Sequence, residues 1–283
     1  MKLDDFESVF RSAVKTQFHH EPPIIESALL VTDVAEAETE AMLEQVRVFL
    51  SNTHNSTEIE WSTMNSGDFS EVAEVLDRVR RNPPSIVVCY RHILGQGSKL
   101  PYSLGSTVDT LTQATDVPVL LLPRPDGKVL SLPTSTEQVM VVTDHLTGDD
   151  RLVNWAAHLC TLEGTLYLTH VEDETVLAHY IDVMSKITGI GHDVVETKLP
   201  EKLLQIPLDY IKSTAEVLAN DGDREKVEPV VVLGDPVTYY EKLVVEKDVD
   251  LLVMNTKDAG QSAMHALAYA LAVEIRDRPL LLL

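Results

Sequence analysis

The sequence predicts an α/β protein in which each half of the chain builds its own sheet of parallel strands. Short apolar runs rich in β-branched residues alternate with segments of helical periodicity, the order that produces βαβ units. The same series of motifs occurs twice along the chain, which indicates a duplicated domain. At 283 residues, the chain is long enough for two domains that each bury a core.

We expect four parts along the chain: an N-terminal helix and linker over 1–23, a first domain over 24–125, a linker over 126–136 and a second domain over 137–283. The N-terminal helix is predicted to be amphipathic and to cap the first domain or a partner, because its apolar residues recur at mostly helical spacing. These residues are Phe6, Val9, Phe10, Val14 and Phe18. The pair His19-His20 that follows favours a solvated turn over a metal site, because no third ligand is nearby.

In the first domain, strands are expected at 28–31, 59–64, 86–90 and 117–122, with helices at 36–50, 69–80 and from 106 to 114. In the second, strands are expected at 139–143, 166–171, 230–233, 250–254 and 279–283, with helices at 152–160, 174–188 and 200–219. The strand at 166–171 has no counterpart in the first half. We therefore expect the first domain to be shorter by one βα unit.

Charge and composition exclude several classes of function. The formal net charge of -22 would repel a phosphate backbone, so we expect no nucleic acid partner. No apolar run is long enough to span a bilayer, and the N-terminus lacks the pattern of a secretory signal. The two cysteines, Cys89 and Cys160, lie in apolar runs and are expected to be reduced, which favours a cytoplasmic location.

The loop after the strand at 86–90 carries the features of a phosphate site. Nine residues separate Gly95 from Gly105, and Ser106 and Thr107 follow at the start of a helix. Glycines allow the backbone to approach a ligand, while hydroxyl and free N–H groups at a helix start bind anions. The alternative is that Gly105 only starts a helix and Gly95 only turns the loop.

Two charged residues are candidates for contacts with the same ligand. Asp33 ends the first strand, where open α/β sheets bind ligands, so it is expected either to hold a ribose or base or to cap the helix at 36–50. Arg91 is a candidate charge partner for phosphate. The chain offers no catalytic base, nucleophile or metal cage, so we expect hydrolysis of a bound ligand to be slow at most.

With these features, residues 27–283 resemble the universal stress protein family in its tandem form. The resemblance depends on the strand endings at Asp33 and Asp144, on the turns Gly67-Asp68 and Gly234-Asp235, and on the glycine loop between two apolar strands. It implies Rossmann-like sheets with the strand order 3-2-1-4-5. It also implies a stress-response function.

Members of this family that bind ATP resemble Gly-x2-Gly-x9-Gly-Ser/Thr over the phosphate loop. The first half keeps the later part of this pattern, but His92 replaces the first glycine. In the second half Asn255-Thr256-Lys257-Asp258 replaces the first turn, and Ala266-Leu267 falls where Gly-Ser is expected. The resemblance therefore implies ATP, or alternatively AMP, in the first domain only, and it implies a buried structural role for His170.

The resemblance also implies that the apolar strands at 119–122 and 279–283 pair with each other and make the chain an internal pseudo-dimer, which a second copy could join as a homodimer. Two function classes stay open. One is an ATP-binding regulator that acts through a protein partner, and the other is a nucleotide-free interaction module. An adenylyl-transfer enzyme is a third, more distant reading, because no second substrate site can be named.

Overall fold

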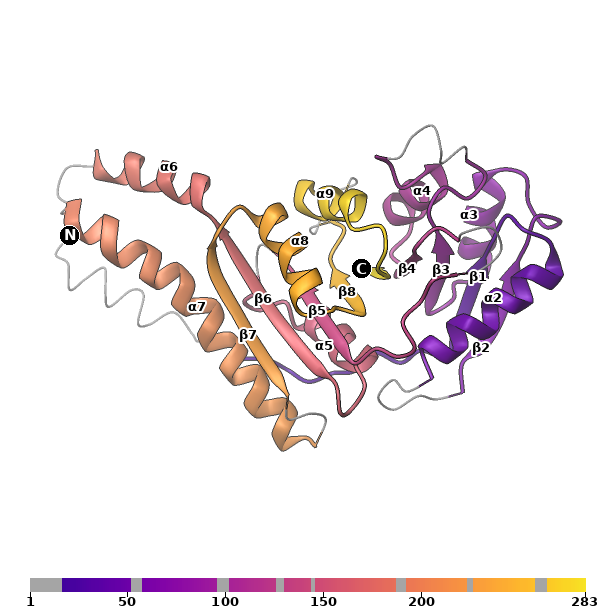
Figure 1. The fold of residues 1–283 in the computed structure, drawn as a ribbon, viewed down its shortest axis with the longest axis horizontal. Helices are drawn as coiled ribbons and strands as arrows, with labels where there is room; N and C mark the ends of the chain where they lie inside the picture. The colour runs from indigo at the N-terminus through magenta and orange to yellow at the C-terminus, as the bar shows by residue number, and fades with distance from the viewer. Residues whose placement is uncertain are drawn as a thin grey trace.

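The computed structural model describes residues 17–51, 58–95, 102–125, 130–143, 146–186, 192–222, 226–257 and 264–283, without the side chains of 192–194. Within these residues the two halves share one nine-stranded sheet of the order β2-β1-β3-β4-β9-β8-β5-β6-β7, with helices packed around it (Figure 1). Most of the helix predicted before residue 18 lies outside the described residues.

The first half contributes four strands, all parallel to one another. Its elements are β1 (Ser27–Val31), α2 (Glu36–Phe49), β2 (Glu60–Met64), α3 (Val72–Arg81), β3 (Ile86–Tyr90), α4 (Ser106–Ala114) and β4 (Val119–Leu122). β3 and β4 are buried along their whole length, as expected for central strands of a parallel sheet. Over its described residues this half has one βα unit fewer than the second half, as predicted.

The second half contributes five strands in the order β9-β8-β5-β6-β7. Its elements are β5 (Gln138–Val142), α5 (Asp150–Leu159), β6 (Thr165–Asp173), α6 (Glu174–Ser185), α7 (His192–Asn220), β7 (Val227–Gly234), α8 (Pro236–Glu246), β8 (Leu251–Met254), α9 (Ala266–Glu274) and β9 (Leu280–Leu282). Numbered along this half alone, the order is 3-2-1-4-5, as predicted.

Helix α7 is longer than the sequence predicted. We expected it to begin at Pro200, but it begins at His192 and continues through both Pro200 and Pro207. A proline inside a helix removes one backbone hydrogen bond and costs about 3 kcal/mol. Tyr210 and Ile211 are buried on this helix, so tertiary packing offsets the poor local propensity.

The two halves join through β4 and β9, which pair antiparallel in the middle of the sheet. Leu120 lies opposite Leu281, with Val119 opposite Leu282 and Leu121 opposite Leu280. This pairing satisfies the backbone groups of two strands that would otherwise be exposed apolar edges. The predicted internal pseudo-dimer is therefore confirmed.

The register of this junction identifies equivalent residues in the two halves. The pairing of β4 with β9 is symmetric about Leu120 and Leu281, so Val119 is equivalent to Leu280. Val87 pairs with Val119 and Leu252 pairs with Leu280, so Val87 is equivalent to Leu252, and the residues that follow β3 and β8 can be matched one by one. In this register His92 corresponds to Lys257. We call such pairs counterparts.

Residues 17–26 precede β1 and lie against the second half; we call them the N-terminal strap (Figure 1). The solvated turn expected at His19-His20 is wrong for His20, whereas the side chain of His19 is 76% exposed. The His20 side chain is 11% exposed and its Nδ1 lies 2.9 Å from Oδ2 of Asp221, while Nδ1 of His19 lies 3.0 Å from Oδ2 of Asp150. The strap thus connects β1 of the first half to helices of the second.

Candidate functional site

The candidate site lies where β1 and β3, neighbours in the sheet, reach their carboxyl ends. The chain leaves β1 towards β2 on one side, whereas β3 continues towards β4 on the other, so this is the switch point of the first half. Open α/β sheets bind ligands in such places. The loop after β3 and the first turn of α4 complete the site.

Asp33 is tied to that loop in the structure. Its Oδ2 accepts a hydrogen bond from the backbone N–H of Leu94 at 2.9 Å, and its Oδ1 accepts one from the Tyr90 hydroxyl. Burial, together with the bond to Asp33, raises the pKa of Tyr90. The residue that caps α2 is Ala35, so the expectation that Asp33 caps this helix is wrong.

His92 holds the turn that the family pattern gives to a glycine. Its φ is 60°, in the left-handed region, and Leu94 follows with φ 59°. The backbone N–H of His92 donates to Leu104 O at 3.0 Å, and its carbonyl accepts from the N–H of Gly95 at 3.0 Å. These bonds hold a conformation that a residue with a Cβ ordinarily avoids.

Gly105 packs directly on His92. A Cβ at Gly105 would lie 2.8 Å from the His92 Cα and 2.9 Å from its N, and φ is 93°. This position therefore requires glycine for packing alone. Gly105 is the N-cap of α4, the exposed Ser106 is the first helical residue, and the Thr107 hydroxyl donates to Ile93 O at 3.3 Å.

Arg91 points to the other half of the molecule. Its side chain is buried, and its guanidinium donates to the carbonyls of Ala272 and, at 2.6 Å, Ile275 at the end of α9. Burial, and after it the charge of Arg276, lowers the pKa of Arg91 to about 10. Its role as a phosphate partner stays a prediction, and this position argues against it.

A different cation, Arg124, lies near the loop that follows β3, and it was not identified from the sequence. Arg124 is exposed just beyond the end of β4. Burial lowers the pKa of His92 first, and the charge of Arg124 is the next largest cause. The sequence did contain a signal for Arg124, because it directly follows an apolar strand. Cations at the carboxyl edge of a parallel sheet lie beside the position where ligands bind.

The counterpart loop in the second half is closed in another way. The backbone N–H and the hydroxyl of Thr256 both donate to Leu283 O, at 2.9 and 2.7 Å. His265 caps α9, and Ala266 is its first residue. These two residues correspond to Gly105 and Ser106, so the predicted alignment was one residue late.

Lys257, although it is the counterpart of His92, makes a contact across the junction that resembles the contact of Arg91. Its Nζ lies 3.2 Å from Thr115 O, at the end of α4, and 3.3 Å from Oδ1 of Asp116. Each half therefore sends a cation to the C-terminal end of the other half's last helix, where the helix dipole favours positive charge.

His170 is buried on β6, as expected, with Nε2 3.2 Å from Oε2 of Glu172. Over the described parts of the chain, no cluster of three or more His, Cys, Asp and Glu side chains is arranged to hold a metal ion. No described helix has the length and apolarity needed to cross a membrane.

Comparisons with known proteins identify the fold of both halves and the family of the second half. The family model described as the universal stress protein family matches residues 136–270. A functionally unknown protein from Pseudomonas aeruginosa PAO1 is 13% identical with a TM-score of 0.55, and the match covers 92% of each chain. A universal stress protein from Archaeoglobus fulgidus DSM 4304 is 13% identical with a TM-score of 0.53, covering 90% of this chain and 95% of that one.

At 13% identity the solved structures show similarity of fold only, and this similarity extends over both halves of the chain. No curated protein matches the sequence. The match of the family model falls on the second half, whose five-stranded sheet has the complete order. On this evidence residues 136–270 belong to the universal stress protein family, and both halves of the chain share the fold of its solved members.

Proposed function

We propose that this protein is a stress-response regulator that binds an adenine nucleotide, ATP or AMP, in its first half only and signals its occupancy to a protein partner. The proposal is carried by one observation. Asp33, the loop after β3 and the Gly105-Ser106 start of α4 meet at the switch point of the first sheet. In the second half, His265 stands in the place of Gly105 at the start of the equivalent helix.

In this proposal the phosphates bind at the first turn of α4, where the Ser106 hydroxyl and free N–H groups are available. Arg124 replaces Arg91 as the cation that faces them. Asp33 holds the ribose or the base, and it releases the N–H of Leu94 when it does so. His92 narrows this turn, so we expect weak affinity.

The second candidate function is a nucleotide-free interaction module. It is favoured by the same bond between Asp33 and Leu94, because each of these two groups already has a partner within the protein. The buried His92 ring in the place of a glycine favours it as well.

Isothermal titration calorimetry with ATP and with AMP separates these functions. Gly105→Trp would clash with the His92 backbone, so the better variant is Ser106→Trp, on an exposed helix start. Its matched control is Ala266→Trp, the exposed counterpart in the second half. We expect binding that Ser106→Trp abolishes and Ala266→Trp leaves unchanged.

His92→Gly sharpens the same experiment. Glycine accepts a φ of 60° without strain and removes the side chain from the turn. We expect affinity for the nucleotide to rise about tenfold, equivalent to about 1.4 kcal/mol. If neither the natural chain nor His92→Gly binds ATP or AMP, the interaction module becomes the working function.

A further inference from the structure

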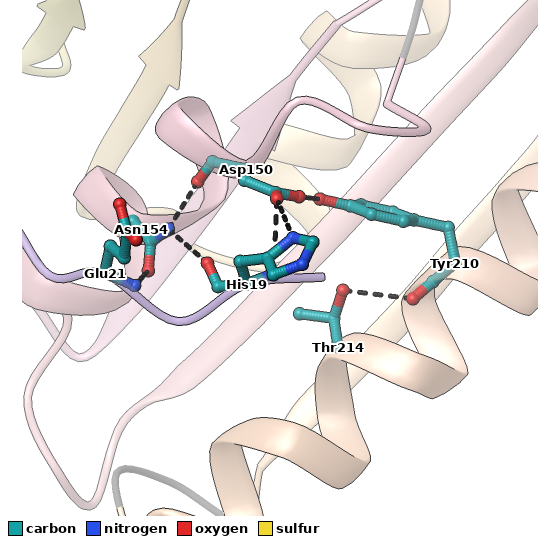
Figure 2. Close-up of polar contacts among 6 residues, drawn as sticks. All are labelled: His19, Glu21, Asp150, Asn154, Tyr210 and Thr214. Carbon is teal, nitrogen blue, oxygen red and sulfur yellow. Dashed lines mark hydrogen bonds and ion pairs between the residues drawn. The ribbon is translucent and has the colours of Figure 1, made fainter. Parts of the chain in front are cut away.

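The N-terminal strap is held between α5 and α7 mainly through its backbone (Figure 2). The Asn154 amide on α5 accepts from the N–H of Glu21 and donates to the carbonyl of His19, both at 2.9 Å. The Asp150 carboxylate accepts from the N–H of His19 at 3.2 Å and from the Tyr210 hydroxyl of α7 at 2.6 Å. This network fixes where the strap meets α7.

Phe18, the second residue of the strap, is buried in the core, with 3% of its surface exposed. Its ring meets that of Tyr210 edge-on, with the centroids 6.4 Å apart, and stacks near His20 at 6.2 Å. The strap therefore begins against Tyr210 of α7, with Gln17 exposed just before this contact.

Helix α7 carries an apolar stripe that continues from this contact. Leu199, Leu203, Ile206 and Tyr210 follow at steps of four, three and four residues, so they lie on one side of the helix. Tyr210 is buried under Phe18, whereas Ile206 is 43% exposed and the two leucines are partly exposed. The stripe is covered at the strap and open beyond it.

The segment before the strap has a matching stripe, formed by Phe6, Val9, Phe10 and Val14 and ended by Phe18. As a helix, residues 4–16 would be about 20 Å long, and the eleven steps from Leu199 to Tyr210 span about 16 Å of α7. We propose that residues 4–16 dock as an amphipathic helix on the open stripe of α7, running parallel to it.

At the far end, two exposed lysines of α7 come within reach of the acidic start of the segment, and the exposed Glu196 lies on the opposite flank of the stripe. A parallel helix anchored at Phe18 brings Asp4, Asp5 and Glu7 near the turns of α7 that precede Leu203. Lys198 and Lys202 are exposed there, on the flank of the stripe. The occupant is thus a segment of this chain. A second copy of the chain is the competing occupant, and the test must separate the two.

Hydrogen–deuterium exchange of the full-length chain tests the docking. We expect amides of residues 4–16 to be protected in the natural chain and in Ser8→Asp, because Ser8 lies opposite the apolar stripe of its helix. Phe10→Asp, and Ile206→Asp on α7, should each abolish that protection while β-sheet amides stay protected. Rapid exchange of residues 4–16 in the natural chain would overturn the proposal.

A pair of introduced cysteines identifies the occupant. Val14→Cys and Ile206→Cys, combined in one chain, should form a disulfide within the chain and migrate as a monomer on a non-reducing gel. Ser12→Cys with Ile206→Cys is the matched control and should not cross-link. A cross-linked dimer would assign the stripe to a second copy and overturn the proposal. Cys89 and Cys160 are buried and do not interfere.

Discussion

The loops that follow β3 and β8 occupy the same place in the two halves, yet they are built from different chemistry. The first loop combines a left-handed His92 with a glycine that packs directly on it. The second binds its Thr256 to the carbonyl of Leu283 and caps its helix with His265. The strands of the two halves therefore keep the same register, while the loop changes from a glycine-containing anion-site pattern to a turn that is bonded to the end of the chain.

The largest expected effect comes from the two helix caps. Gly105→Ala places a Cβ against the His92 backbone at positive φ, so it should lower the free energy of unfolding by about 2–4 kcal/mol. His265→Ala loses a single 3.4 Å capping bond and should cost less than about 1 kcal/mol. Urea denaturation of both variants checks this. If both variants lost a similar free energy of unfolding, the two helix starts would be equally sensitive to substitution, and the proposed difference between them would be wrong.

The next effect concerns the two cations that cross the junction. Arg91→Met leaves the buried carbonyls of Ala272 and Ile275 without their donors and should cost about 2–3 kcal/mol. Lys257→Met removes an ion pair to Asp116, whose side chain is 98% exposed, and should cost less than about 1 kcal/mol. Chemical denaturation measures both losses, and a larger loss for Lys257→Met would contradict this order.

The smallest effect is a pH dependence confined to the first loop. Burial lowers the pKa of His92 from its usual 6.5, so the unfolded chain takes up this proton at a higher pH than the folded one. Stability should therefore fall as the pH drops through 6.5. We expect His92→Gln to reduce this loss by up to about 1 kcal/mol between about pH 7.5 and about pH 5.5.

Denaturation curves of both proteins at the two pH values measure that difference. If His92→Gln loses as much stability as the natural chain, the pH dependence arises elsewhere and the His92 loop does not distinguish the halves in this respect.

Much of the fold could be predicted because its signals are local. Strand β3 reads as a buried strand from its apolar, β-branched residues, and the repeated Thr-Asp and Gly-Asp endings mark the duplication. The pairing of β4 with β9 was predicted from the family resemblance. The start of α7 was not, because packing of Tyr210 and Ile211 outweighs the local effect of two prolines.

The candidate site could be predicted only in part. Gly105 and Asp33 do meet at one loop, but their partners depend on three-dimensional contacts that spacing does not encode. Arg91 adjoins the loop in sequence, yet its side chain crosses to α9, while Arg124 comes near from a different strand. Sequence proximity is a poor guide to which cation faces a ligand.

The antiparallel junction of β4 and β9 has a consequence for how such a molecule can change. In a dimer of identical chains, every substitution appears on both sides of the two-fold axis, so the subunits cannot divide their tasks. Covalent fusion removes that constraint and keeps the halves at high effective concentration. One half is then free to replace the glycine at its helix start and to extend α6 and α7, while the other keeps a loop that its neighbour's α9 still supports.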